Sequence, residues 1–289
     1  MQPTLEPVQV MPTRNPLFAW GIAGITVALV GYLWATRSIS AAEFMYEVPR
    51  FTEPQGFLET SWLYMYLHIF TMIPVLALSF DRRVHFYRKW KYLFPGIAVV
   101  ATAFIVWDVF FTEWRVWGFN ESYFLGVRIF GLPIEEWLFF FTVPYACLFV
   151  YECLNYYIKP DLFGGIEKML TPLLVISCFV FGFVSWEAIY TSTTFLLTGG
   201  ALAIHYLYVQ KPYRSRFYFA YLIVWIPFTL VDGALTGGFT AEPVVLYHPD
   251  EFWGIRVGSI PMEDAVYNFL MLLGITTIFE KLRGKQWSR

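Results

Sequence analysis

Charged side chains are scarce in this sequence. Lysine, arginine, aspartate and glutamate together make up 15% of the 289 residues, whereas soluble domains contain about a quarter. Hydrophobic residues reach 57%, aromatic residues reach 21%, and the mean hydropathy is positive. A chain of this composition has too few polar groups to cover a water-exposed surface, so a soluble domain is excluded and an integral membrane protein is indicated.

Signatures of cofactor chemistry are also missing. The three cysteines, Cys147, Cys153 and Cys178, lie inside apolar runs without the histidine or carboxylate spacing of a metal site. There is no glycine-rich nucleotide fingerprint, and no lysine lies in the middle of an apolar run, where a retinal Schiff base would need it. We therefore expect no cofactor, no metal and no nucleic-acid partner.

Long apolar runs are what the sequence does contain. A helix needs about 20 apolar residues to cross the hydrocarbon core of a bilayer, and runs near that length predict an all-α, polytopic membrane protein with about eight transmembrane helices. The first run is expected to be a true span, because it lacks the basic segment and cleavage site of a signal peptide. The predicted spans are residues 17–36, 61–80, 93–111, 133–157, 169–189, 193–210, 217–236 and 261–280.

The basic residues predict the orientation. If the N-terminus is inside, all but five of the 20 lysines and arginines lie in the segments on its side of the membrane. By the positive-inside rule, both termini are then cytoplasmic, in a multi-pass protein that we expect in the cell membrane. The five on the other side are Arg37, Arg50, Arg115, Arg128 and Arg256.

The sequence contains an internal repeat. The stretch "GVRIFGLPIEEWLFFF" from Gly126 matches "GIRVGSIPMEDAVYNF" from Gly254 at a constant offset of 128 residues, and "VWDVFFT" matches "LVDGALT". We predict two homologous four-helix repeats, residues 1–157 and 158–289, with the same orientation in the membrane. The polar residues that the repeat pairs are Arg128 with Arg256, Glu135 with Glu263, Glu136 with Asp264, and Asp108 with Asp232.

Each repeat carries a proline and two adjacent acids at the start of a predicted membrane helix, at residues 133–136 and 261–264. A proline and acids in the first turn are ordinary helix-start chemistry, but ionisable groups inside a membrane are costly and usually functional. Two neighbouring carboxylates in low dielectric cannot both ionise cheaply. With an arginine nearby, we expect one neutral acid beside one paired carboxylate, and the sequence does not say which is which.

These motifs resemble the integral-membrane lycopene cyclases, which consist of two homologous half-units, separate in some bacteria and fused in archaea, other bacteria and fungi. The resemblance rests on "WDVFFTEWRVWGFN", "GLPIEEWLFFFTVPYACLFVYE" and "IPMEDAVYNFLMLLG" and spans about residues 60–282. It implies lycopene β-cyclase activity: non-redox closure of the linear ends of lycopene into β-ionone rings, giving γ-carotene and β-carotene. A neutral acid would protonate the terminal double bond, and a base would later remove a ring proton.

The resemblance also implies roles for individual residues. The candidate acids and bases are Glu135, Glu136, Glu263 and Asp264, and we expect Glu135 and Glu263 to be essential, since each lies one turn from an aromatic residue. Asp108, Asp232, Arg128, Arg256 and Asn268 are candidate supporting polar residues. Rings that could line the substrate or stabilise a cation are those of Trp107, Trp117, Phe139, Phe140 and Tyr267.

Several alternatives stay open at this stage. A carotenoid hydratase would protonate the same double bond and admit water, and a carotenoid- or lipid-binding membrane protein would need no catalytic acid. The second repeat has fewer aromatic residues near its acids, so one active centre is as plausible as two. Expected partners are lycopene and related linear carotenoids, membrane lipid, and the enzymes that supply lycopene.

Overall fold

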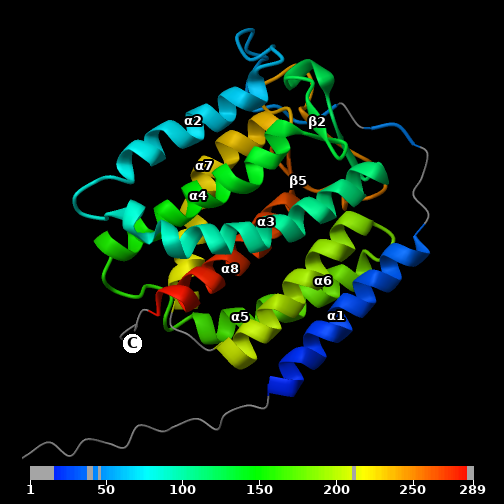
Figure 1. Cartoon of the computed structure of the whole chain (residues 1–289). Helices are drawn as coiled ribbons and strands as arrows, with labels where there is room; N and C mark the ends of the chain where they lie inside the picture. The colour runs from blue at the N-terminus through cyan, green and yellow to red at the C-terminus, as the bar shows by residue number, and fades with distance from the viewer. Residues whose placement is uncertain (1–15, 38–41, 45–46, 210–212, 285–289) are drawn as a thin grey trace, which may run out of the picture.

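Eight α-helices dominate the computed structural model, which describes residues 16–37, 42–44, 47–209 and 213–284 (Figure 1). The all-α architecture and the number of helices predicted from the apolar runs are confirmed. The helices are α1 Pro16–Thr36, α2 Leu63–Leu78, α3 Trp90–Glu113, α4 Ile134–Tyr157, α5 Glu167–Val184, α6 Ile189–Ile204, α7 Tyr213–Leu235 and α8 Met262–Arg283.

Six of these helices, all but α2 and α6, are long and apolar enough to cross a membrane, so the chain is a membrane protein. Helix α2 is apolar but only 16 residues long, and α6 has 16 residues followed by a π-helix at His205–Val209. The predicted span 169–189 is too long, because α5 ends at Val184 and α6 begins at Ile189. Ser185 and Glu187 interrupt the apolar run there and form the connection between the two helices.

The helices of the two repeats interlock. Helix α3 packs along α8, and α4 packs along α7, while α2 lies on α4 and α6 lies on α8. In this arrangement α2, α3 and α4 correspond to α6, α7 and α8. Helices α1 and α5 both pack against α6, and α1 lies on the side of the molecule away from α2 (Figure 1). The division of the chain between residues 157 and 158 stays a prediction.

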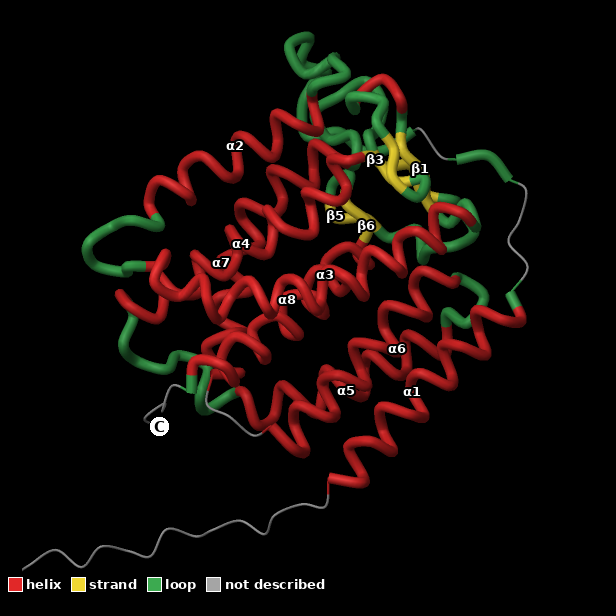
Figure 2. The backbone as a smooth tube through the Cα atoms, in the orientation of Figure 1, coloured by secondary structure: helices red, strands yellow, loops and turns green. Residues whose placement is uncertain are grey.

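Short strands gather at one end of the helices, beside the starts of α4 and α8 (Figure 2). Strands β2 (Arg128–Ile129) and β3 (Leu132–Pro133) form a hairpin that leads into α4, and β5 (Arg256–Val257) and β6 (Ile260–Pro261) form one that leads into α8. Strand β1 (Trp117–Phe119) pairs antiparallel with β4 (Val245–Tyr247) and so joins the loops of the two repeats. Single-turn 3-10 helices lie at Phe86–Lys89 and Glu121–Tyr123.

The repeat extends to individual backbone bonds in these loops. Ile134 N donates to Val127 O over 2.9 Å, and 128 residues later Met262 N donates to Ile255 O over 3.0 Å. Gly126 and Gly254 both adopt a left-handed conformation, with φ of 83° and 77°. A side chain there would be strained, which explains why both copies of the motif open with glycine.

At the opposite end, buried ionic groups connect α4 and α8. Glu152 accepts hydrogen bonds from Arg283 over 2.5 Å and from Lys89, and Glu280 accepts one from the same Arg283 over 2.6 Å. The hydroxyl of Tyr151 also donates to Glu280 over 3.0 Å. Four basic residues that support the predicted orientation lie outside the described residues, namely Arg14, Lys211, Lys285 and Arg289.

Candidate active site

Four carboxylates from four helices meet at a cavity of about 60 Å³ at the starts of α4 and α8. Asp108 comes from α3, Glu136 from α4, Asp232 from α7 and Asp264 from α8. All four residues are buried, with at most 8% of their surface exposed. The repeat paired these residues in the sequence, and the interlocked helices bring both pairs to one cavity instead of two separate ones.

Tyrosine hydroxyls hold the two acids that come second in each motif. Tyr64 of α2 donates to Glu136 Oε2 over 2.6 Å. Asp264 accepts from two phenols, that of Tyr190 of α6 at Oδ1 over 2.5 Å and that of Tyr247 of β4 at Oδ2 over 2.7 Å. Hydrogen bonds to an ionised acceptor are stronger than neutral ones, so this arrangement suits an anion at Asp264.

The sequence interpretation missed all three tyrosines. Tyr64 and Tyr190 lie 126 residues apart, close to the offset of the motif, so the repeat carried a signal for this pair. Tyr247 lies in a loop strand outside the membrane helices, and its counterpart at the offset of 128 is Phe119, which has no hydroxyl to suggest this role. Burial raises the pKa of Tyr247 well above its ordinary value, and the nearby Asp264 acts in the same direction. Its hydroxyl therefore stays protonated and available as a donor.

The two aspartates of α3 and α7 differ in their partners. Asp108 Oδ1 accepts from the indole of Trp117 over 2.6 Å and from Thr112 over 3.4 Å. The Oδ2 atoms of Asp108 and Asp232 are buried and have no hydrogen-bond partner among the described residues. A buried polar atom without a partner is expensive to keep, so each of these oxygens is free to meet a reacting group.

The first acid of each motif does not line the cavity. Glu135 Oε1 accepts from Leu125 N over 2.9 Å, and Glu263 Oε1 accepts from Trp253 N over 2.8 Å, again 128 residues apart. Glu263 also accepts from Thr191 over 2.5 Å. Both glutamates are fully buried and fasten the loops that precede the two hairpins. The essential role expected for them remains a prediction that this geometry does not support.

The position of the aromatic residues explains why the sequence interpretation favoured the first acid of each motif, although the second acid lines the cavity. The side chains of Phe139 and Tyr267 do line the cavity. The motif acids that line it with them are Glu136 and Asp264, each three residues before its aromatic residue. The sequence interpretation had paired the two aromatic residues with Glu135 and Glu263, four residues earlier. Residues three and four apart both share a face of a helix, so spacing alone could not choose between the two acids.

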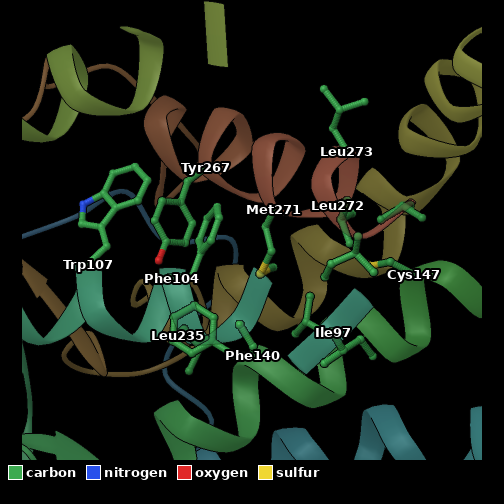
Figure 3. Close-up of a cluster of buried hydrophobic side chains, with 14 of the residues drawn as sticks. Ile97, Phe104, Trp107, Phe140, Cys147, Leu235, Tyr267, Met271, Leu272 and Leu273 are labelled. Atoms are coloured by element: carbon green, nitrogen blue, oxygen red, sulfur yellow. The ribbon is translucent and has the colours of Figure 1, made fainter. Parts of the chain in front are cut away.

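The remaining ring and amide candidates divide between the wall of the cavity and the layer behind it. Trp117 and Asn268 line the cavity. Trp107 and Phe140 are buried behind the wall, and the ring centroid of Trp107 lies 4.9 Å from that of Tyr267 (Figure 3). Both polar atoms of the Asn268 side chain are buried without a partner within the described part of the chain.

The structure places Arg128 and Arg256 beside the hairpins, where their hydrogen bonds go to other partners than the motif carboxylates. Arg128 donates to Gly131 O over 2.8 Å and pairs with Glu121 at 3.5 Å, and Arg256 donates to Ser259 O. Among the residues that the structure describes, neither arginine forms an ion pair with an acid of the motif. Each guanidinium group thus bonds a carbonyl in the turn of its own hairpin.

A second, larger cavity adjoins the first. This groove of about 180 Å³ lies between α2, α4 and α7, and carbon atoms form nearly all of its surface. The two cavities share Phe139, Phe228 and Asp232. Asp232 thus stands where the apolar groove meets the acidic cavity. Within the described ranges, no group of three or more histidine, cysteine, aspartate or glutamate side chains is arranged to hold a metal ion.

Comparisons with known proteins agree with this picture. The chain is 27% identical over 94 residues to the bifunctional lycopene cyclase/phytoene synthase of Neurospora crassa, a match that covers 32% of this chain and 16% of the fungal protein. No solved structure matches. The family model described as lycopene cyclase matches residues 60–154 and 187–282, one segment in each repeat and about two thirds of the chain together. The chain therefore belongs to the lycopene cyclase family.

Proposed function

We propose that this protein is a lycopene β-cyclase, an intramolecular lyase or isomerase that closes the linear ends of lycopene into β-ionone rings without net oxidation. One observation carries the proposal: four carboxylates converge on an aromatic-lined cavity that adjoins an apolar groove. The groove suits a polyene chain, and the cavity supplies acids where the end of that chain would lie.

The reaction needs one proton donor and one base. A neutral carboxyl group protonates the terminal double bond and leaves a tertiary cation, which the next double bond attacks to close the ring. A carboxylate then removes a ring proton and leaves the ring double bond. One proton enters and one leaves, so the product is an isomer of the substrate.

The contacts favour Asp232 as the donor. It is the acid that borders both the groove and the cavity, and its buried Oδ2 has no partner among the described residues. Glu136 and Asp264 are held by phenols and are the carboxylates that would receive the ring proton. Asp108, held by Trp117, faces the same space and adds negative charge near the cation.

Aromatic rings on the cavity wall support the cationic intermediate. Trp117, Phe139 and Tyr267 line the cavity, and an aromatic face stabilises a desolvated cation by about 2 kcal/mol or more. The same rings exclude water, which would otherwise trap the cation as an alcohol. This separates cyclisation from hydration, the nearest alternative reaction.

The test is expression in a host that accumulates lycopene, followed by pigment analysis. We expect β-carotene or γ-carotene from the wild type, and a loss of about 100-fold or more for Asp232→Asn, Glu136→Gln and Asp264→Asn, since general acid–base groups contribute that much. Glu135→Gln and Glu263→Gln are the matched controls. They keep an oxygen that can accept the bonds from Leu125 N and Trp253 N, so we expect them to retain most of the activity.

Each other outcome has a distinct meaning. Unchanged lycopene beside a correctly inserted wild type would contradict the cyclase proposal, and a product heavier by one water would identify a hydratase. A change of pigment binding that survives all five substitutions would indicate a non-catalytic carotenoid-binding protein. Inactive but folded Glu135→Gln and Glu263→Gln variants would restore the roles that the sequence interpretation gave to the first acids.

Two further proposals concern the setting of the enzyme. We place it in the cell membrane with both termini in the cytoplasm, on the basis of the basic residues that follow the even-numbered spans. We also propose that it associates with membrane lipid and with the enzymes that supply lycopene, because substrate and product are insoluble in water.

A further inference from the structure

The apolar groove has a counterpart position in the other repeat. Its helices α2, α4 and α7 correspond to α6, α8 and α3. At the offset of 128, Phe139 and Val143 of the groove correspond to Tyr267 and Met271. Along the paired helices α7 and α3 the offset is 124, so Val231 of the groove corresponds to Trp107. The residues at the counterpart position are therefore larger at each of these places.

These larger side chains fill the counterpart position. The ring centroid of Tyr267 lies 4.8 Å from that of Phe104 and 4.9 Å from that of Trp107. Met271 has no exposed surface. Figure 3 shows Trp107, Phe104, Tyr267 and Met271 packed side by side. A polyene chain would have to displace these rings in order to enter on this side.

Helix α1 closes the same side from outside. The indole of Trp34 donates to Thr193 of α6 over 2.9 Å, and its ring centroid lies 5.4 Å from that of Phe111 and 5.3 Å from that of Trp114 near the end of α3. Nearer the start of α1, the Thr26 hydroxyl lies so close to α6 that a Cβ added at Gly200 would come within 2.6 Å of it. Such close approach at a small residue is typical of tight helix packing in membranes. Helix α1 therefore bridges α6 and α3.

The groove between α2 and α7 is open by comparison. Three of its lining residues are exposed on the outside of the helices, namely Phe70, which is 64% exposed, Pro74 and Pro227. Both prolines lie inside helices, where the ring prevents a regular backbone hydrogen bond and disturbs the helix. The exposed residues of the groove thus lie along apolar helices and not at their ends, which suits an opening toward the lipid chains.

We propose that this groove is the single lateral entrance of the enzyme, and that it takes the polyene chain of a linear carotenoid directly from the bilayer, one end at a time. Helix α1 and the rings around Tyr267 close the equivalent entrance of the other repeat. This inference rests on the proposed cyclase function. It implies that a molecule cyclised at one end withdraws and returns with its other end, so the monocyclic carotenoid competes with lycopene for one site.

The first test fills the groove. Val231→Trp introduces the residue that the repeat has at Trp107, and Ala146→Phe adds a ring on the facing helix α4. The added rings would occupy the volume that the polyene chain needs, so we expect the rates with lycopene and with a purified monocyclic carotenoid to fall together, by about tenfold or more. The matched controls are Leu222→Trp, also on α7 and 54% exposed, and Val99→Phe on α3, 62% exposed, which should change neither rate.

Thermal unfolding in detergent verifies that each variant folds. The inference is overturned if folded Val231→Trp and Ala146→Phe slow only one of the two steps, or slow neither. A wild type that makes no cyclic product from lycopene would instead contradict the proposed function. The two failures are therefore distinguishable in one set of assays.

The second test uses the wild type alone. Isotope-labelled lycopene is supplied in vesicles together with unlabelled monocyclic carotenoid, and the label in the bicyclic product is measured over time. A single entrance predicts that the label is diluted in proportion to the unlabelled pool. Bicyclic product with undiluted label would mean that both ends react without release, and it would overturn the inference.

Discussion

At the scale of single residues, the cavity is unusual in how it holds its acids. Arginines lie nearby, but the two second acids of the motifs are held by neutral phenols, and Asp108 by an indole. An ion pair would fix a carboxylate in its charged form. A neutral phenol supports the anion, and it still permits protonation of the carboxylate because its O–H can rotate away. This suits groups that must give and receive protons within one catalytic cycle.

The phenols are therefore expected to contribute to the rate. We predict that Tyr190→Phe and Tyr247→Phe, each of which removes one donor from Asp264, lower the turnover of lycopene by about tenfold or more, because a hydrogen bond to a charged group contributes about 1.5–3 kcal/mol. The measurement is the initial rate in vesicles at saturating substrate. Tyr66→Phe, on α2 and 48% exposed, is the control and should leave the rate unchanged. Full activity in both test variants would show that Asp264 needs no such support.

At the scale of elements, hydropathy predicts most of the fold. Runs of apolar residues identify each of the eight helices because lipid requires long apolar segments. The boundary between α5 and α6 was misplaced, since two polar residues, Ser185 and Glu187, hardly lower the average over a long window. The hairpins could not be predicted because their strands are only two residues long, and the pairing of β1 with β4 could not be predicted because these short strands are distant in sequence.

The candidate site was predictable only in part. The repeat paired six acids, and the four that line the cavity are among them. Spacing could not choose between Glu135 and Glu136, because both lie in the first turn of α4 and both have an aromatic residue on the same face. Tyr247 enters from a strand outside the repeat motif, and its contact with Asp264 depends on the path of a long loop.

The ionic cluster at the other end of α4 and α8 is expected to stabilise the pairing of these helices. Arg283 bonds both Glu152 and Glu280, whose side chains are 3% and 1% exposed. Removing one partner of a buried ion pair leaves an uncompensated charge, so we predict that Arg283→Met lowers the free energy of unfolding by about 3 kcal/mol. Thermal unfolding in detergent measures this. Lys281→Met, an exposed position on the same helix, is the control.

Arg283→Lys provides a second comparison. It keeps the charge but loses the fork that reaches two carboxylates, so its stability should lie between those of the wild type and Arg283→Met. Equal stability of all three proteins would mean that the carboxylates are protonated or solvated in the folded protein, and that the cluster contributes little to the helix pairing.

At the scale of the whole molecule, neither repeat holds a complete cavity. Its acids come from α3 and α4 of the first repeat and from α7 and α8 of the second, and the sheet over it pairs β1 with β4. Helix α3 packs on α8 and α4 packs on α7, so the helices of the two repeats are interleaved. Two segments with apolar, complementary faces can assemble in a membrane after separate insertion. The connection between α4 and α5 therefore need not be covalent for the cavity to form.

We predict that residues 1–157 and 158–289, expressed as two chains in one lycopene-accumulating host, restore cyclisation, whereas either chain alone gives none. Pigment analysis measures the product, and co-purification measures the association. The control pairs residues 1–157 with a second chain that carries Asp264→Asn, which should associate normally and remain inactive. Cyclic product from one chain alone would contradict a shared cavity, because it would require a complete set of acids within a single repeat. Association without activity in the unmodified pair would instead show that the covalent connection is needed to align the two halves of the cavity.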